Sequence, residues 1–219
     1  RIKKGFQSGS GLGSSSASSA AAALAYNDLL DNPFSLNELI PFAAFGEKLA
    51  CGSAHVDNVA ASLLGGMVLV VNNEIYEVPI PEELIAIILK SDQKLMTAES
   101  RAVLPQEVSV SNAVEQASNL AGFLSSMYSG NLEGLSKLSS DKLAEPYRKN
   151  LIPEFDKMKA LAEPEAFCFG ISGSGPSMFA LTLGWENAQS LLTRLQYEYS
   201  GEVWLEELSK NGGARIIES

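Results

Sequence analysis

The sequence is poor in the residues that build metal centres, disulfide frameworks and membrane spans. It has one histidine and two cysteines in 219 residues, and no apolar run approaches the roughly 20 residues of a membrane span. One histidine excludes the usual zinc sites, which take several His or Cys ligands. Cys51 and Cys168 fit neither a metal spacing nor a disulfide framework, so we expect reduced structural thiols. With no basic segment leading into an apolar stretch, we expect a cytoplasmic protein without a membrane partner.

Positive charge is also scarce. The chain has 16 Lys and Arg residues against 26 Asp and Glu residues, which gives a formal net charge of -10. Because binding a polyanion requires a positive surface, this balance argues against nucleic acid as a partner. Any anionic substrate must be held by local groups that act against the overall charge. The 46% of hydrophobic residues suffice for the core of one large domain or two small ones.

The sequence opens at Arg1, without methionine, and enters a glycine-rich stretch by Gly9. A glycine loop that binds phosphate normally follows structure that forms the other wall of its pocket. We therefore expect the sequence to be the remainder of a longer protein.

This stretch, SGSGLGSSSASSAAAALAYNDLL, runs from three alternating glycines through serines into an alanine-rich helix pattern. Gly9, Gly11 and Gly13 permit positive φ and close approach of the backbone to a ligand. Ser14 to Ser16 are typical N-cap residues for a helix over residues 14–31. Loop N–H groups and the helix dipole then converge on a site suited to phosphate. The alternative is a flexible linker, which would not run directly into a strong helix former.

The loop is neither a Walker loop nor the dinucleotide fingerprint. It lacks Gly-Lys-Ser/Thr, and Ser16 stands where the fingerprint has its third glycine. The predicted phosphate-binding residues are Gly9, Ser10, Gly11, Leu12, Gly13, Ser14, Ser15 and Ser16.

Three motifs, in the same order, resemble those of the GHMP kinases. Gly11-Leu-Gly-Ser-Ser15 is similar to their phosphate loop. The stretch Gly52-Ser-Ala-His-Val-Asp-Asn58 resembles the corresponding segment of the homoserine kinases within that family. Gly170-Ile-Ser-Gly-Ser-Gly-Pro-Ser177 is similar to the C-terminal glycine motif. The resemblance covers essentially the whole sequence, but the family's Asn-Leu-Gly-x-Gly-Phe-Asp type motif does not occur in it.

The resemblance implies an α+β, two-domain GHMP kinase fold. Residues 1–78 would be the C-terminal part of the ATP-binding domain, a remnant of a ribosomal protein S5 domain 2-like domain. Residues 79–219 would form a ferredoxin-like C-terminal α/β sandwich. The turn over residues 172–175 would close over the phosphate site, the alternative being a tight turn in a hairpin-like connection.

Hydrophobic patterns place the elements of this fold. They predict helices over residues 108–128, 155–161 and 186–199, and strands over residues 67–71, 84–89, 166–169, 177–183, 203–206 and 215–217.

The resemblance also implies ATP as phosphate donor and Mg²⁺ as its metal ion. Magnesium takes hard oxygen ligands and keeps several waters, so one carboxylate and one hydroxyl suffice. The homoserine kinases have a glutamate eight residues before the histidine, which is Glu47 here, and a hydroxyl from the serine pair, Ser14 or Ser15. Without the resemblance, Glu47 would be read as a solvated charge on a helix face.

The same resemblance implies that residues 55–58 bind the phosphate acceptor. Asn58 would hydrogen-bond the reacting hydroxyl, and Asp57 would meet the ammonium group of an amino acid. We predict that Asp57, Asn58 and Glu47 are the catalytic residues. Whether Asp57 or Asn58 removes the proton stays open, because positioning and electrostatics alone can supply much of the catalysis. His55 is predicted to be hydrogen-bonded and to shape the substrate site, with a general base as the alternative.

An amino-acid carboxylate is suited to arginine, whose guanidinium is planar and always charged. Arg101, in a Thr-x-x-x-Arg segment with Thr97 at a helix start, and Arg148 resemble the two family arginines. The spacing of four residues puts Thr97 and Arg101 on one helix face. Gly173 completes the predicted substrate-binding set. The alternative for either arginine alone is a solvated surface charge.

Together these residues predict the phosphorylation of L-homoserine by ATP on the route to threonine, with homodimer formation left open. One alternative is a GHMP kinase acting on another small alcohol, which the His55-x-Asp57-Asn58 stretch and the two arginines disfavour, since a neutral sugar would not need the arginine pair. The other is a catalytically silent ligand-binding relative, since a fold can outlive its chemistry.

Overall fold

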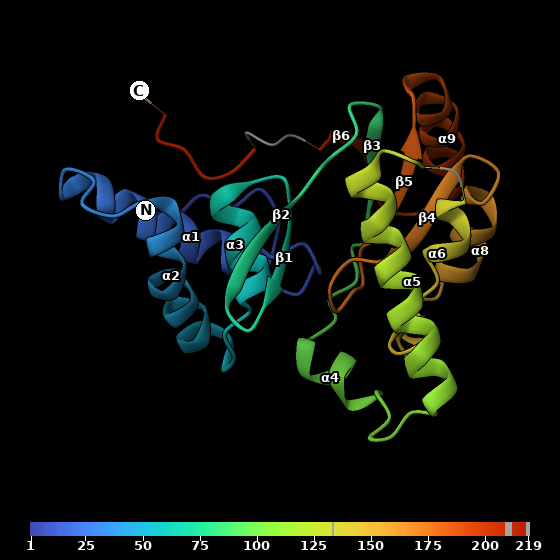
Figure 1. The fold of residues 1–219 in the computed structure, drawn as a ribbon, viewed down its shortest axis with the longest axis horizontal. Helices are drawn as coiled ribbons and strands as arrows, with labels where there is room; N and C mark the ends of the chain where they lie inside the picture. Colours follow the sequence, from blue (N-terminus) through green and yellow to red (C-terminus); the bar gives the residue numbers. More distant parts are fainter. Residues whose placement is uncertain (133, 209–211, 218–219) are drawn as a thin grey trace. The chain divides into compact units, whose positions relative to one another are not determined.

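The computed structural model describes residues 1–132, 134–208 and 212–217, and for Ala50 and Cys51 the backbone alone. It divides into two compact units, each described here by itself (Figure 1). The first comprises Arg1–Ser8, Gly13–Ile80 and the described part of Leu208–Ser219. The second comprises Gly9–Leu12 and Pro81–Glu207.

The chain passes from the first unit to the second after Ile80, close to the expected division between residues 78 and 79. Two short segments depart from this division of the sequence. Gly9–Leu12 belongs to the second unit, and the C-terminal segment belongs to the first. The boundaries of the family domains stay a prediction. The prediction of a reduced thiol at Cys51 lies outside the described residues.

Three helices and a hairpin make up the first unit. The helices are α1 (Ser14–Leu29), α2 (Leu36–Cys51) and α3 (Val56–Leu64), and the hairpin strands are β1 (Met67–Val71) and β2 (Glu74–Val78). The helices pack on one another around a common core of Ala20, Leu24, Leu39, Ile40, Ala43, Val59, Ala60 and Leu63. Small side chains on α1 let the helices approach closely, as the alanine pattern predicted.

The start of α1 corrects one prediction. Gly13, in the left-handed region with φ 69°, is the N-cap, and no side chain caps the helix. Ser14 to Ser16 lie inside the first turn, where the Ser14 hydroxyl donates to the Phe6 carbonyl at 3.0 Å. The predicted serine cap is therefore wrong, because the helix begins one residue earlier than a serine cap requires.

Residues 212–217, the described part of the C-terminal segment, pack on the end of α3 and form no strand. A Cβ at Gly213 would stand 2.3 Å from the Leu63 carbonyl oxygen, so only glycine allows this approach. The Ala214 N–H donates to the Ser62 carbonyl at 2.9 Å. The predicted strand over residues 215–217 is wrong, because the backbone here bonds to a helix end and, in the described part of the segment, pairs with no other strand.

The second unit is built on a four-stranded antiparallel sheet. Its strands are β3 (Leu84–Lys90), β4 (Ala166–Ile171), β5 (Met178–Leu183) and β6 (Glu202–Glu207), in the order β4-β5-β3-β6. Its helices are α4 (Thr97–Ala102), α5 (Val110–Ser129), α6 (Leu135–Leu138), α7 (Glu145–Arg148), η1 (Lys149–Leu151), α8 (Phe155–Ala162) and α9 (Trp185–Glu198). This strand order and direction are those of a ferredoxin-like sandwich, so the predicted fold of this part is confirmed.

The core of the second unit lies between this sheet and α8 and α9 (Figure 1). Ile87, Leu89 and Met178 from the sheet meet Met158 of α8 and Leu191 of α9, all fully buried. Apart from the segment at residues 215–217, the predicted helices and strands of this region agree with the structure to within two residues at each end. Cys168 on β4 is a free thiol, and burial raises its pKa to about 11.

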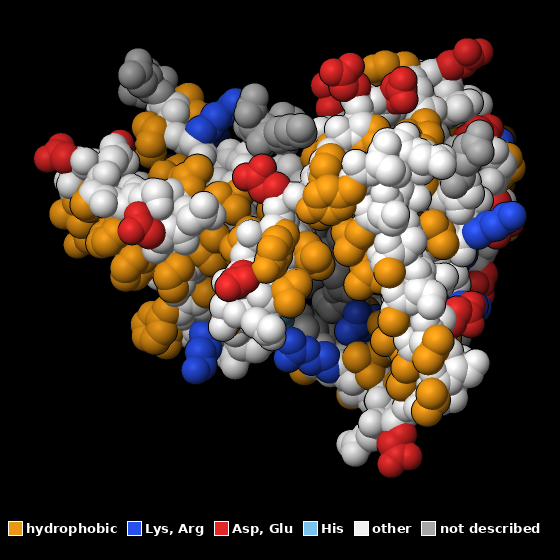
Figure 2. Space-filling view, viewed as in Figure 1, with side chains coloured by type: hydrophobic (Ala, Val, Ile, Leu, Met, Phe, Trp, Pro, Cys, Tyr) orange, Lys and Arg blue, Asp and Glu red, His pale blue; other side chains and the backbone are white. Residues whose placement is uncertain are grey.

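An apolar face of α1 and α2 points away from the core of the first unit. Tyr26, Leu29, Phe42, Phe45 and Leu49 are all more than half exposed. Figure 2 shows hydrophobic side chains gathered over this end of the unit. Apolar patches of this kind are typical of surfaces that another polypeptide covers. In the described part of the chain, no helix is both long and apolar enough to cross a membrane.

Candidate active site

The glycine loop adopts the backbone that its composition predicted. Gly9, Gly11 and Gly13 have φ values of 82°, 84° and 69°, all in the left-handed region. The loop is anchored through its carbonyl oxygens, which are acceptors for three groups of the second unit. These are the Leu95 N–H to Gly9 at 3.3 Å, the Ser177 N–H to Ser10 at 3.2 Å and the Ser172 hydroxyl to Gly11 at 2.9 Å.

Gly11 is in direct contact with the turn that joins β4 to β5. A Cβ at Gly11 would stand 2.6 Å from the Ser172 carbonyl oxygen and 2.7 Å from that of Gly175. Both neighbours are backbone atoms, which cannot swing aside as a side chain can. The two glycine motifs are therefore packed against each other, as expected for a turn that closes over the loop.

We predict that Gly11→Ala disrupts this contact. The left-handed backbone alone costs an alanine about 1 to 2 kcal/mol, and overlap with the turn adds to that. Chemical denaturation should show a lower free energy of unfolding, and the KM for ATP should rise. Gly13→Ala is the matched control, because its backbone is also left-handed but its Cβ would have its nearest neighbour 4.0 Å away. Equal effects of the two substitutions would contradict the role assigned to the close approach.

The first turn of α1 presents N–H groups that the helix itself does not use. The first four N–H groups of any α-helix lack an intrahelical partner, and together with the helix dipole they attract anions. In α1 they come from the serine-rich start that directly follows Gly13. Ser14 and Ser16 are buried, whereas Ser15 is half-buried.

Glu47 on α2 is a buried carboxylate directed at this serine turn. It is only 2% exposed. Burial raises its pKa, but the nearby polar groups of Ser15, His55 and Ser16 together outweigh that effect and hold the pKa below its ordinary value of 4.5. Glu47 is therefore ionised at neutral pH. The structure contradicts the alternative reading of Glu47 as a solvated charge on a helix face.

His55, the residue before α3, lies against Glu47. Its Nδ1 is 3.1 Å from Glu47 Oε1, and its Nε2 is 3.3 Å from the Ser53 hydroxyl. Both ring nitrogens are thus engaged inside the first unit, and the ring is about one-fifth exposed. A hydrogen-bonded histidine was predicted and is found. Its predicted part in shaping the substrate site stays a prediction.

Asp57 and Asn58 follow on the first turn of α3, and both are exposed. The Asn58 Cγ lies 4.0 Å from the position that a Cβ at Gly13 would take. The structure therefore brings Asn58 beside the N-terminus of α1 and leaves the Asp57 carboxylate in solvent. Among the described residues, no hydrogen bond holds the Asp57 carboxylate or the Asn58 amide. Either group can therefore reach a ligand.

A second group of predicted residues lies in the second unit. Arg148 Nε donates to the Ser100 carbonyl at 3.3 Å, and its Nη1 donates to the Gly173 carbonyl at 3.1 Å. Burial lowers the pKa of Arg148; the charge of Asp141 opposes this shift and that of nearby Arg101 adds to it. Two cationic groups therefore lie close together beside the turn.

Arg101 and Thr97 share the short helix α4, as their spacing predicted. Arg101 is exposed and Thr97 is half-buried. The fully buried Ser100 fixes α4 to the turn, because its hydroxyl donates to the Ser174 carbonyl at 2.7 Å. The structure thus joins α4, Arg148 and Gly173 into one cluster, which also contacts the segment Gly9–Leu12.

A hollow of about 160 Å³ opens beside this second cluster. Arg148 and Gly173 line it together with two carboxylate residues, Asp141 and Glu145. The Asp141 carboxylate accepts three backbone N–H groups, from Leu143 and the two residues after it, at 2.7 to 3.0 Å. The lining therefore combines a guanidinium with carboxylates, which suits a small ligand that carries both charges.

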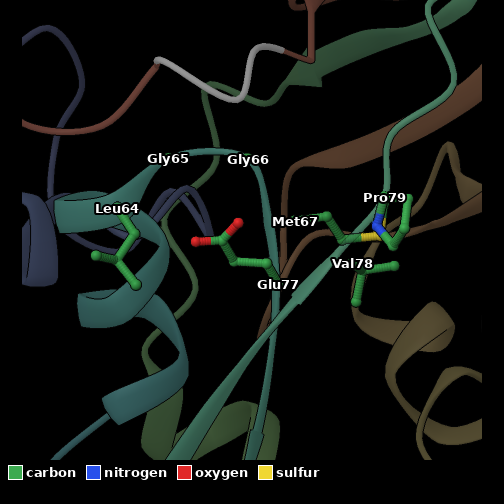
Figure 3. Close-up of a pocket in the computed structure, with 7 residues that line it drawn as sticks. All are labelled: Leu64, Gly65, Gly66, Met67, Glu77, Val78 and Pro79. Carbon is green, nitrogen blue, oxygen red and sulfur yellow. The ribbon is translucent and has the colours of Figure 1, made fainter. Parts of the chain in front are cut away.

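Another hollow, of about 190 Å³, lies in the first unit between the end of α3 and the β1–β2 hairpin (Figure 3). Its lining residues are Leu64, Gly65, Gly66, Met67, Glu77, Val78 and Pro79. In Figure 3 the Glu77 carboxylate lies between Leu64 on one side and Met67 and Val78 on the other. An anionic group among apolar side chains repels phosphate, and this hollow contains none of the predicted site residues.

The oxygen atoms near Glu47 fit a magnesium ion. Glu47 Oε2 and the Ser16 hydroxyl are buried, and no described residue lies within hydrogen-bond geometry of either atom. A buried carboxylate oxygen without a donor is costly unless a cation meets it. The described residues contain no group of three or more His, Cys, Asp or Glu side chains that could hold a metal. A metal here would depend on a single carboxylate, hydroxyls and its substrate.

Two residues of the site, Ser53 and Ser100, had no predicted role. Ser53 lies two residues before His55 within the motif over residues 52–58, and that position is the signal that could have found it. Ser100 gave no signal, because a serine in a short helix with charged neighbours is normally exposed. Only the packing of α4 on the turn buries it.

Comparison with known proteins finds similarity along nearly the whole chain. The model of the GHMP kinases N terminal domain matches residues 1–66, and that of the GHMP kinases C terminal matches residues 123–201. The chain is 36% identical to the homoserine kinase of Chlorobium phaeobacteroides (strain BS1), covering 99% of this chain and 71% of the relative. It is 33% identical to the homoserine kinase of Chlorobaculum tepidum, covering 99% of this chain and 70% of the relative.

Among solved structures, the homoserine kinase from Cytophaga hutchinsonii superposes with a TM-score of 0.91 at 37% identity. The match covers 95% of this chain and 69% of that one. The L. major mevalonate kinase in complex with R-mevalonate superposes with a TM-score of 0.72 at 15% identity, over 95% of this chain and 68% of that one. At that identity the likeness concerns the fold alone.

Proposed function

The chain belongs to the GHMP kinase family, and we propose that it transfers the γ-phosphate of ATP to the side-chain hydroxyl of L-homoserine. The observation that carries the proposal is the match to homoserine kinases over nearly the whole chain. The product would be O-phospho-L-homoserine, on the route to threonine. A cytoplasmic location and a homodimer remain predictions.

In the proposed reaction the homoserine hydroxyl oxygen attacks the γ-phosphorus. The bond between that phosphorus and the bridging oxygen of the β-phosphate breaks, ADP leaves, and the hydroxyl proton passes to solvent water. Such transfers need positioning and electrostatic stabilisation more than covalent participation by the protein. We therefore assign no general base.

In this proposal residues 9–16 bind the phosphates of ATP. The N–H groups of the glycine loop and of the first turn of α1 donate to phosphate oxygens. The contact between Gly11 and the turn at residues 172–175 holds the loop in its left-handed conformation, so little reorganisation is needed when ATP binds.

Glu47, with the hydroxyl of Ser14 or Ser15, would hold magnesium. The ion, when bound, would neutralise negative charge that develops on the phosphates. What supports this assignment is the buried, ionised Glu47 carboxylate with an oxygen that no described residue meets.

Different side chains bind the hydroxyl, ammonium and carboxylate groups of homoserine. Asn58 hydrogen-bonds the reacting hydroxyl, and Asp57 meets the ammonium group. Arg101 and Arg148 bind the carboxylate, since two neighbouring guanidinium groups match an anion of this size. Thr97 and Gly173 line the same substrate site.

The test is substrate preference. ADP release should be measured with L-homoserine, mevalonate and galactose as acceptors, and with no acceptor as the control. We expect kcat/KM for L-homoserine to exceed the others by on the order of a hundredfold or more, because buried polar groups built for one ligand are left unpaired by another.

The two alternatives give different results in this assay. Equal or greater turnover of mevalonate or galactose would indicate a GHMP kinase for another small alcohol. Binding of ATP without turnover of any acceptor would indicate a silent relative.

A further inference from the structure

We infer that His55 is a positioning residue for Glu47, and that the chain of side chains Ser53–His55–Glu47 holds the carboxylate with one oxygen engaged and the other open to a metal ion. This inference rests on the proposed function, because it takes Glu47 as the magnesium ligand. It assigns the single histidine of this sequence to the metal side of the reaction.

The geometry begins with the short connection between α2 and α3. Glu47 lies in the last turns of α2, which ends at Cys51, and Gly52 follows in the left-handed region with φ 77°. The reversal brings His55 back over the carboxylate eight residues earlier in the chain. The result is the 3.1 Å contact between His55 Nδ1 and Glu47 Oε1.

The chemistry of the three groups sets the direction of the hydrogen bonds. An ionised carboxylate can only accept, so His55 Nδ1 carries the proton and donates it. In the neutral ring Nε2 is then an acceptor, and the Ser53 hydroxyl, 3.3 Å away, donates to it. The partner of one ring nitrogen thus fixes the state of the other.

The two oxygens of Glu47 are consequently not equivalent. Oε1 is held by His55, whereas Oε2 is buried and meets no donor among the described residues. A carboxylate that is free to rotate would exchange these environments. The imidazole prevents this exchange, in the way that hydrogen-bond partners of metal ligands commonly orient them.

The same contacts argue against other roles for the ring nitrogens. A general base needs a nitrogen within hydrogen-bond reach of the substrate hydroxyl. Here one nitrogen faces Glu47 and the other faces Ser53. The ring can border a substrate, but its nitrogens serve the carboxylate.

Two substitutions separate the nitrogens. In His55→Asn the amide nitrogen takes the place of Nδ1 and keeps the donor to Glu47. In His55→Gln the amide reaches toward the place of Nε2 and leaves Glu47 without that donor. The primary measurement is Mn²⁺ binding to the protein in the presence of ADP, followed by electron paramagnetic resonance, so that no turnover is required.

We expect His55→Gln to weaken Mn²⁺ binding about tenfold or more, the usual range for loss of a partner of a metal ligand, and His55→Asn to stay within about threefold of wild type. In the assay with homoserine, His55→Gln should raise the Mg²⁺ concentration needed for half-maximal rate and leave the KM for homoserine nearly unchanged. In a Glu47→Gln background, His55→Gln should have no further effect on Mn²⁺ binding.

Ser53→Ala is a second variant that leaves the ring in place and removes its Nε2 partner. It should weaken Mn²⁺ binding less than His55→Gln, and it keeps the comparison available if His55→Gln does not fold, as judged by circular dichroism. Unchanged Mn²⁺ binding in both His55→Gln and Ser53→Ala would overturn the inference, as would equal loss in His55→Asn and His55→Gln.

Failure of the proposed function would look different. If the wild-type protein phosphorylated no homoserine while the Mn²⁺ pattern held, the substrate assignment would fall and the role of His55 would stand. If homoserine were phosphorylated and its KM rose in the His55 variants with Mn²⁺ binding unchanged, the role of His55 would fall and the reaction would stand.

Discussion

Glu47→Gln should lower kcat for homoserine phosphorylation by about a hundredfold or more at saturating Mg²⁺, since a bound metal ion would supply several kcal/mol of stabilisation to the transferring phosphoryl group and Glu47 is its proposed carboxylate ligand. Gln keeps the shape of the side chain and removes its charge. The loss should appear mainly in kcat, because the charge is felt most as phosphoryl charge develops. The KM for homoserine should change little.

A matched control tests whether the loss of an unrelated carboxylate has the same effect. Glu82→Gln removes the same charge from an exposed position outside both clusters, and its kinetics should equal those of wild type. Thermal unfolding of Glu47→Gln should also be followed, because a neutral amide replaces a buried carboxylate there. A folded Glu47→Gln protein with near-normal kcat at saturating Mg²⁺ would refute the metal assignment.

Arg101→Ala should raise the KM for homoserine about ten- to a hundredfold and leave the KM for ATP nearly unchanged. A charge-assisted hydrogen bond lost from a binding site costs about 1.5 to 3 kcal/mol, which corresponds to that range. The effect should belong to the carboxylate of the amino acid. 3-Amino-1-propanol, which lacks the carboxylate, should be a poor substrate for wild type and hardly worse for Arg101→Ala.

Arg148→Ala should differ from Arg101→Ala in one respect. Arg148 also donates to the carbonyls of Ser100 and Gly173, and the turn that contains Gly173 contacts Gly11. We therefore expect the KM for ATP to rise together with that for homoserine. A guanidinium has five N–H groups, so these two bonds do not exhaust its donors.

Arg215→Ala, at an exposed arginine of the C-terminal segment, serves as the control for both arginines and should change neither KM. A parallel rise in both KM values for Arg101→Ala would move this arginine to the nucleotide side. The argument for an amino-acid substrate would then lose its main physical support.

The turn of the β1–β2 hairpin and the start of α2 were not predicted, although short sequence motifs indicate both. The hairpin β1–β2 turns at Asn72 and Asn73, both with positive φ, and asparagine is among the few residues that tolerate such a turn. Helix α2 opens with a capping box, in which Ser35 and Glu38 satisfy each other's backbone N–H groups. Both signals could have been read from the sequence.

Other errors had no local remedy. Residues 215–217 are β-prone, but a strand forms only where a sheet edge is available, and Gly213 instead packs on the end of α3. Serines after a glycine are ordinary cap residues. That Gly13 would cap α1, with Ser14 bonded to Phe6, depends on where the preceding segment lies.

The sequence by itself determined the left-handed glycine loop and most of the helices and strands of the second unit, because these depend on glycine's freedom of φ and on the period of apolar residues. The family, the reaction class and the ferredoxin-like arrangement were implied by the resemblance of three motifs to those of the GHMP kinases. Only the tertiary structure decided that Glu47 is buried and held at one oxygen by His55, that Gly11 is packed against the turn at Ser172, and that Ser100 and Arg148 are joined through that turn. The physical reason is that burial and hydrogen bonding between residues up to 161 positions apart depend on how the helices and the sheet pack, which local preferences of the chain do not encode.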